Sequence, residues 1–281
     1  MKVYQRLAYL PTGMAPPDSM ESIDAWWAQQ GVKPAQMVKA RRPSEPGTYA
    51  IDCLMDARDK KPSEIPTTLD IEPTLEIKRA DGTTIDVLAG TELALAPILK
   101  HALRNVAAVH PAGAGLYGQV VYEHSPTYQP HRISWRNRND LLRDAGLFDA
   151  CAALFPSCYA MSEKVDSAGR PVMPSAQKQY DIVAAHILEC NRVARKPVYV
   201  FFKTKLRSTG GTEYAIDCSP ELFDATFRAV RDAGGQGVVL WSEVKSRELP
   251  GGQPDPLKGL TPLTGNEPWL PVVLEAARGR G

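Results

Sequence analysis

The sequence predicts an α/β protein with the architecture of a (β/α) TIM-like barrel, regular or distorted, with about seven parallel strands. Two observations support this prediction. Short apolar runs alternate with segments that have helical spacing, and the length of 281 residues suits one such barrel. An open, doubly wound sheet is the alternative architecture. We expect the chain to form a single domain over residues 1–281.

The predicted strands are short apolar runs rich in Val, Ile, Leu and aromatic residues, which is typical of buried parallel strands. In chain order they span 7–10, 49–55, 67–71, 115–122, 152–159, 197–202 and 237–241. Pro11 follows the first run and Pro73 follows the third run closely, as expected where strands pass into loops.

The predicted helices lie between these runs and show apolar residues at helical spacing. They span 20–30, 92–109, 176–195 and 220–233. Ser19 is the expected N-cap of the first helix and Gly31 its stop signal. Ser219 followed by Pro220 marks the start of the last one, and Pro97 must lie near a start or a kink.

The composition indicates a globular protein, with 43% hydrophobic residues, 23% charged residues and a formal net charge of +1. This balance gives no reason to expect a nucleic-acid or membrane partner. The first residues contain no apolar targeting segment, and no stretch approaches the roughly 20 apolar residues of a membrane span. We therefore expect a protein that is cytoplasmic where it is synthesised, with release by lysis, incorporation into a virion and homo-oligomerisation left open.

The cysteines and common motifs exclude several kinds of site. The five cysteines are an odd number without C-x-x-C spacing, so we expect buried, reduced thiols rather than a disulfide framework or a zinc ribbon. Residues 113–118 match G-x-G-x-x-G, but they follow a predicted helix and open a strand, so we interpret them as a tight turn. Without a P-loop, a nucleophile elbow or a metal-binding histidine pair, we expect no cofactor and no metal.

Two carboxylates at the end of the third predicted strand are the main candidates for catalysis, because functional residues of barrels lie at the carboxyl ends of strands. Asp70 and Glu72 are two positions apart and point to the same face, opposite Leu69 and Ile71. Mutual repulsion and burial should raise the pKa of at least one carboxyl, and a proton held on Glu72 would make it a general acid. The alternative is a structural ion pair with an Arg or Lys.

Aromatic residues at other strand ends are candidates for substrate binding. Tyr159 ends the fifth run, Trp241 ends the seventh with Glu243 just beyond it, and Tyr117 and Tyr122 belong to the fourth. A tyrosine hydroxyl can hydrogen-bond a polar ligand, and a tryptophan can form an apolar wall for a sugar ring. The alternative is that these aromatic rings belong to the barrel core.

The polar segment 123–139 follows the fourth run and is therefore expected on the same face. It interleaves aromatic and basic residues, as a polyanionic or sugar chain would require, whereas a solvated loop with a few ion pairs is the alternative. These residues are His124, Tyr128, His131, Arg132, Trp135, Arg136 and Arg138.

Four motifs, in this order and over residues 67–245, resemble the hyaluronidase family of glycoside hydrolases. The first is Asp70-Ile71-Glu72, which matches the family's Asp-x-Glu at the end of an early barrel strand. The others are Arg138-Asn139-Asp140-Leu141 followed by Ala153-Leu154-Phe155-Pro156-Ser157-Cys158-Tyr159, then Pro197-Val198-Tyr199-Val200-Phe201, and finally Gly237-Val238-Val239-Leu240-Trp241-Ser242.

This resemblance implies a retaining hydrolase that cleaves an N-acetylhexosamine-containing polysaccharide, with the substrate's own acetamido group as the nucleophile. By the same resemblance, Glu72 would protonate the leaving oxygen and Asp70 would orient the acetamido N–H. Tyr159 would hydrogen-bond the acetamido group, and Trp241 would pack against its methyl. The implied partner is a polysaccharide, with no cofactor.

Three departures from the family pattern concern the same strand ends. The family continues after the glutamate with a Trp-Arg-Pro type of sequence, whereas this chain has Pro73-Thr74-Leu75. An aromatic, cysteine-containing strand end is replaced by 117–122, and Ser242 replaces a glycine. The pattern therefore fits a distant microbial or phage relative. It leaves open a non-catalytic carbohydrate-binding or structural barrel, such as a phage tail component, and a muramidase-type barrel.

Overall fold

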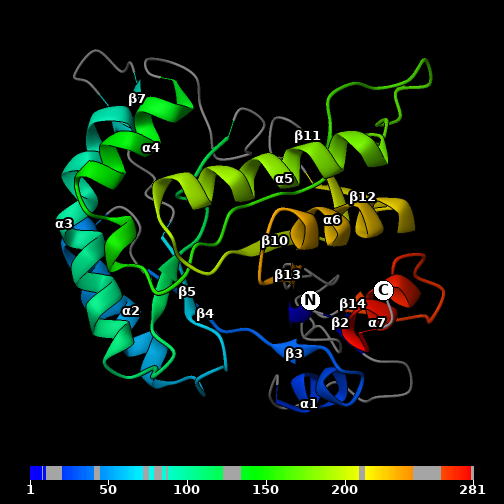
Figure 1. The fold of residues 1–281 in the computed structure, drawn as a ribbon, viewed down its shortest axis with the longest axis horizontal. Helices are drawn as coiled ribbons and strands as arrows, with labels where there is room; N and C mark the ends of the chain where they lie inside the picture. Colours follow the sequence, from blue (N-terminus) through cyan, green and yellow to red (C-terminus); the bar gives the residue numbers. More distant parts are fainter. Residues whose placement is uncertain are drawn as a thin grey trace, which may run out of the picture. The chain divides into compact units, whose positions relative to one another are not determined.

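The computed structural model describes residues 1–7, 9–10, 21–40, 45–71, 76–78, 84–86, 88–122, 134–208, 213–242 and 261–279. They belong to two compact units that interleave along the chain (Figure 1). The first unit comprises Met1–Pro34, Cys158–Ala184 and Val200–Gly281, and the second comprises Ala35–Ser157 and Ala185–Tyr199. A single domain over 1–281 stays a prediction.

The first unit is built on a four-stranded sheet with the order β10-β13-β1-β3. β1 (Lys2–Arg6) lies between β13 (Gly237–Trp241) and β3 (Lys33–Pro34) and runs parallel to both. The remaining strands are β10 (Tyr199–Lys203), β9 (Met161–Ser162), β11 (Lys205–Ser208), β12 (Glu213–Asp217), β2 (Tyr9–Leu10) and β14 (Thr261–Pro262). β9, β11 and β12 form a small second sheet, and β2 pairs with β14.

Helix α6 (Pro220–Asp232) shows how the sequence sets local structure in the first unit. Ser219 occupies the N-cap position with an extended backbone, and Pro220 follows where its missing N–H costs no hydrogen bond. The buried face carries Phe223, which lies edge-on to Phe202 with ring centroids 4.9 Å apart and stacks on Trp269 at 5.8 Å. This aromatic cluster is part of the core of the unit. The other helices are α1 (Glu21–Gln29), α7 (Leu270–Ala277) and the beginning of α5 (Ala176–Val193).

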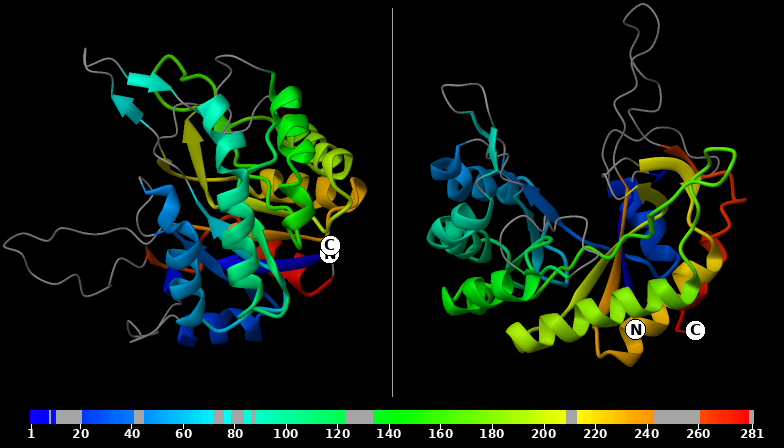
Figure 2. Two further views of the ribbon diagram at one scale, coloured as in Figure 1. Left: turned by 90° about the vertical axis from the view of Figure 1, so that its left-hand side faces the viewer. Right: turned by 90° about the horizontal axis from the view of Figure 1, so that it is seen from above.

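The second unit is built on the parallel sheet β4-β5-β8, formed by Met37–Lys39, Thr67–Asp70 and Ala114–Leu116. Parallel bridges continue it from Tyr117 to Phe155 and from Leu154 to Val198. Helices α2 (Tyr49–Arg58) and α3 (Leu88–Ala107) lie side by side (Figures 1 and 2). The remaining elements are α4 (Trp135–Asp144), the end of α5, the 3₁₀ turns Pro46–Thr48 and Phe148–Ala150, and the hairpin of β6 (Glu76–Lys78) and β7 (Thr84–Asp86).

Much of the predicted secondary structure is confirmed. Five predicted strands correspond to β5, β8, the bridged residues at 154–155, β10 and β13, and the four predicted helices correspond to α1, α3, α5 and α6. Gly31 follows α1 with a positive φ of 86°, and Gly113 has a φ of 82° between α3 and β8, as the interpretation of 113–118 as a tight turn requires. Ser19 lies outside the described residues.

Two predicted strands are wrong. Residues 49–55 belong to helix α2, because the buried side chains Tyr49, Cys53 and Ala57 recur at helical spacing while Ile51 and Met55 are exposed. The first long strand is β1 and not 7–10, and Tyr9 and Leu10 of that run form the short β2. The polar residues of β1 hide it in a hydrophobicity pattern, although one of them, Gln5, is completely buried.

Gly115 in β8 lies where no side chain fits. A Cβ atom built on it would lie 2.2 Å from the carbonyl oxygen of Ala153 and 2.8 Å from the ring of Phe155. We expect Gly115→Ala to lower the free energy of unfolding by about 1–3 kcal/mol, because β8 must move away from the neighbouring backbone. Urea unfolding measures the change, and Gly47→Ala is the matched control, since a Cβ at Gly47 has nothing within 4 Å. Equal stability of the two variants would show that β8 relaxes without cost.

Asp24 in α1 predicts a pH dependence of stability. Its Oδ1 accepts a hydrogen bond of 2.7 Å from the buried Gln5 amide, and burial raises its pKa above the ordinary value of 3.8 despite that bond. An acid with a raised pKa in the folded state stabilises the fold when protonated, and this contribution is lost as the pH rises from 3.8 through the raised value.

We therefore expect Asp24→Asn, which keeps an oxygen for Gln5, to raise the Tm at neutral pH and to leave no gain below pH 3.8. Melting curves across this pH range measure the effect. Asp181→Asn is the control, because the Asp181 carboxylate accepts a similar 2.7 Å bond from Gln177 on an exposed surface. A gain in Tm that is the same at every pH would contradict the prediction.

Candidate functional site

Asp70 is the candidate residue whose surroundings are best defined, and it lies at the carboxyl end of β5. The start of this strand is fixed by Thr67, whose hydroxyl hydrogen-bonds His110 Nδ1, while His110 Nε2 donates to the carbonyl oxygen of Ala57 at 2.9 Å. Leu69 and Ile71 are buried, and Thr68 and Asp70 alternate with them along the strand. Because side chains alternate along a strand, Asp70 lies on the face opposite Leu69.

The Asp70 carboxylate has two different oxygens. Oδ2 forms a 2.9 Å ion pair with Nζ of Lys39, which is the register partner of Asp70 on β4. Oδ1 is buried and has no hydrogen-bond partner among the described residues. The side chain of Asp70 is only 9% exposed, whereas that of Lys39 is 60% exposed. A buried carboxylate oxygen without a donor is costly, so Oδ1 is a strong acceptor for a ligand N–H or O–H.

Glu72 and Glu243 lie outside the described residues, and so do residues 123–133 of the polar segment. The shared face of Asp70 and Glu72 is therefore a prediction. The structural alternative, an ion pair with an Arg or Lys, is found at one oxygen of Asp70, which pairs with Lys39.

Tyr117 and Tyr122 have different surroundings in the second unit. Tyr117 directly follows β8, is 8% exposed and donates its hydroxyl to Ser157 Oγ at 3.1 Å. The ring of Tyr122 contacts Trp135 and His186, with centroid distances of 4.9 and 5.4 Å. Tyr117 lies at the strand ends, whereas Tyr122 packs against α4 and α5.

Tyr159 and Trp241 come together in the first unit. Their rings are nearly parallel, at 10°, with centroids 6.2 Å apart. Lys203, the last residue of β10, places Nζ 3.9 Å from the Trp241 centroid and 5.4 Å from that of Tyr159. Arg207 of β11 lies 5.4 Å from the Tyr159 centroid. Two cations on a pair of stacked rings form a cation–π cluster at the ends of β10 and β13.

Three basic residues that contact Asp70, Tyr159 or Trp241 were not identified from the sequence, namely Lys39, Lys203 and Arg207. Lys203 directly follows the predicted strand 197–202, and this position at a strand end was a usable signal. Lys39 and Arg207 lie on the short strands β4 and β11, which no apolar run marks.

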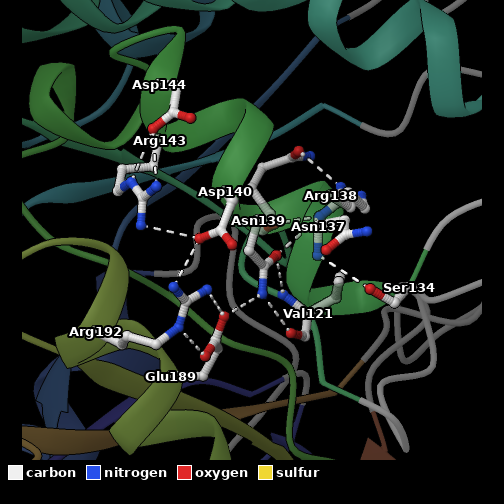
Figure 3. Close-up of polar contacts among 11 residues, drawn as sticks. Val121, Ser134, Asn137, Arg138, Asn139, Asp140, Arg143, Asp144, Glu189 and Arg192 are labelled. Atoms are coloured by element: carbon white, nitrogen blue, oxygen red, sulfur yellow. Dashed lines mark hydrogen bonds and ion pairs between the residues drawn. The ribbon is translucent and has the colours of Figure 1, made fainter.

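The Arg138-Asn139-Asp140 motif is part of a polar network between α4 and α5 (Figure 3). Asn139 is completely buried, and its amide binds both backbone groups of Val121, at 3.2 Å from N–H and 2.8 Å to C=O. It also donates to Glu189 at 2.8 Å, and Glu189 accepts two 2.7 Å bonds from Arg192. Hydrogen bonds to Glu189 raise the pKa of Arg192. In this structure the motif anchors the backbone at 121.

The five cysteines are buried and form no disulfide. Burial raises the pKa of Cys53 and Cys151 to about 12, so these two thiols are poor nucleophiles. Within the described ranges, no group of three His, Cys, Asp or Glu residues is arranged to hold a metal ion. The described helices include none long and apolar enough to cross a membrane.

Comparisons with known proteins support the fold. No protein-family model matches the chain, and no curated protein matches it. Among solved structures, bee venom hyaluronidase is similar, with 15% identity, a TM-score of 0.55 and coverage of 86% of this chain and 91% of that one. Its complex with a hyaluronic acid tetramer gives 14% identity, a TM-score of 0.54 and coverage of 86% and 90%. The chain thus has an α/β fold of the TIM-barrel class, as predicted.

Proposed function

We propose that this chain is a retaining glycoside hydrolase that cleaves an N-acetylhexosamine-containing polysaccharide by substrate-assisted catalysis. The observation that carries the proposal is the buried Oδ1 of Asp70, a carboxylate acceptor without a donor among the described residues. An acetamido N–H of the substrate is a donor of the right kind. The similarity in fold to a hyaluronidase is consistent with the proposal.

In the proposed reaction, Asp70 accepts a hydrogen bond from the acetamido N–H and so makes the acetamido oxygen a better nucleophile. This oxygen attacks the anomeric carbon while Glu72 gives its proton to the leaving glycosidic oxygen. Water then attacks the anomeric carbon from the face that the leaving oxygen occupied, which opens the cyclic intermediate, and gives a proton to Glu72. Since the configuration is inverted twice, the product retains it, and no nucleophile from the protein is needed.

Tyr159 and Trp241 are the proposed binding residues of the first unit. Trp241 is partly exposed and stacks on the buried Tyr159, so its ring can offer an aromatic surface of the kind that binds sugars. Tyr117, Tyr122 and Glu243 stay in the proposal as further binding residues on the evidence of sequence position alone.

The test is the release of reducing ends from hyaluronan, chondroitin, bacterial capsules and peptidoglycan, with the Glu72→Gln variant as the control. Release by the wild type alone, with the anomeric configuration retained in the first product seen by NMR, supports the proposal. Inversion of configuration contradicts substrate assistance. Binding of a glycan without any release would instead indicate the non-catalytic carbohydrate-binding barrel.

A further inference from the structure

We infer that Lys39 is a positioning residue that acts through Asp70, and this inference rests on the proposed function. Lys39 ends β4, Asp70 ends β5, and the two are register partners in the parallel sheet. Lys39 Nζ binds only one oxygen of the carboxylate, Oδ2, at 2.9 Å. It therefore fixes the rotation of the carboxyl group and leaves Oδ1 for the substrate.

The backbone of β4 at Lys39 is held in place by contacts with Asp56 and Lys60. The N–H of Lys39 donates to Asp56 Oδ2 of α2 at 3.0 Å, and the same oxygen pairs with Lys60 Nζ at 2.6 Å. Lys60 also donates to the carbonyl oxygen of Met37 at 2.7 Å. Both ends of β4 are thus tied to the region of α2, so the start of the Lys39 side chain is a fixed point relative to β5.

The exposure of the pair argues for positioning rather than stability. The Lys39 side chain is 60% exposed, and ion pairs with so exposed a partner contribute little to the free energy of folding. The carboxylate, by contrast, is 9% exposed. A cation beside this oxygen keeps a nearly buried carboxylate oriented, which is what a group that must polarise an N–H requires.

Lys39→Ala tests the inference in the full-length protein, with the polysaccharide that the wild type cleaves. We expect kcat to fall by about tenfold to a hundredfold, with a smaller change in KM, because the misoriented carboxylate no longer assists the reacting acetamido group. We expect the Tm to change little. Lys61→Ala is the matched control, since Lys61 is an exposed lysine next to α2, and its kcat should equal that of the wild type.

Two experiments that restore kcat distinguish a positioning role of Lys39 from a structural role. Lys39→Arg should restore part of kcat, because the guanidinium can bind Oδ2. Added propylammonium, which replaces the deleted part of the side chain, should restore kcat of Lys39→Ala in a saturable way, and it can enter because the lysine is largely exposed. Neither recovery is expected if the substitution merely loosens the fold.

A wild-type kcat in Lys39→Ala would overturn the inference and leave the proposed function standing. A loss of kcat that neither Lys39→Arg nor propylammonium restores, together with a lowered Tm, would overturn it as well. If the wild type cleaves none of the polysaccharides, the proposed function fails first, and the role of Lys39 fails with it.

Discussion

Replacing Glu72 by glutamine is expected to abolish polysaccharide cleavage while the protein stays folded. Glutamine has nearly the same size and shape but no transferable proton, so the glycosidic oxygen must leave as an alkoxide. General acid catalysis by a positioned carboxyl accelerates such a step by about 10²- to 10⁴-fold, and we expect a loss of this size in kcat. The measurement is the initial rate of reducing-end release, with circular dichroism to verify folding.

A substrate with a better leaving group provides a second test of the role of Glu72 as a general acid. An aryl glycoside of an N-acetylhexosamine with an acidic phenol needs less protonation, so Glu72→Gln should lose less activity on it than on the polysaccharide. Asp70→Asn should lose activity on both, because its role concerns the acetamido group. Wild-type activity of Glu72→Gln on the polysaccharide would remove Glu72 from the mechanism.

Asn139→Ala is expected to cause the largest loss of stability of a single polar substitution in the second unit. The change leaves the N–H and C=O of Val121 without their side-chain partner and removes a donor from the buried Glu189. Buried polar groups without partners cost more than the bonds themselves contribute. We expect the free energy of unfolding to fall by about 3–5 kcal/mol.

Asn137→Ala provides the matched control, since Asn137 lies on the same helix with an exposed side chain and bonds Ser134 through its backbone N–H (Figure 3). It should change stability by less than about 0.5 kcal/mol. Urea unfolding of both variants gives the comparison. Similar losses would mean that the α4–α5 network of Figure 3 carries no more stability than an exposed helix surface.

The elements that could be predicted are those whose burial is visible in the sequence. β13 coincides with the run 237–241, because Val238, Val239 and Leu240 are all completely buried and leave no polar residue to interrupt the pattern. α2 was mistaken for a strand, since short apolar runs look alike in helices and strands and only the packing decides which of its residues are exposed. β4 has three residues, too few for any periodic signal.

The position of the candidate site could be predicted from the sequence, whereas the contacts of its side chains could not. The carboxyl end of β5 follows from the apolar run and the rule that barrels carry their function there. The ion pair of Asp70 with Lys39 depends on the register of two strands separated by a helix, and no local pattern encodes that register. The contact of Lys203 with the Tyr159 and Trp241 rings likewise joins three distant segments.

The pairing of β1 with β13 has a consequence for how the chain is made. Lys2 pairs with Gly237, so β1 cannot pair with β13 until residue 237 has been synthesised. At typical translation rates this interval is on the order of ten to fifty seconds. During that time the edge of β1 that β13 will cover can pair with other chains, and contacts so distant in sequence also slow folding. Expression at low temperature or with chaperones should therefore raise the soluble yield. Deleting 237–241 removes β13 and should leave both β1 and β10 with an edge that lacks its strand partner.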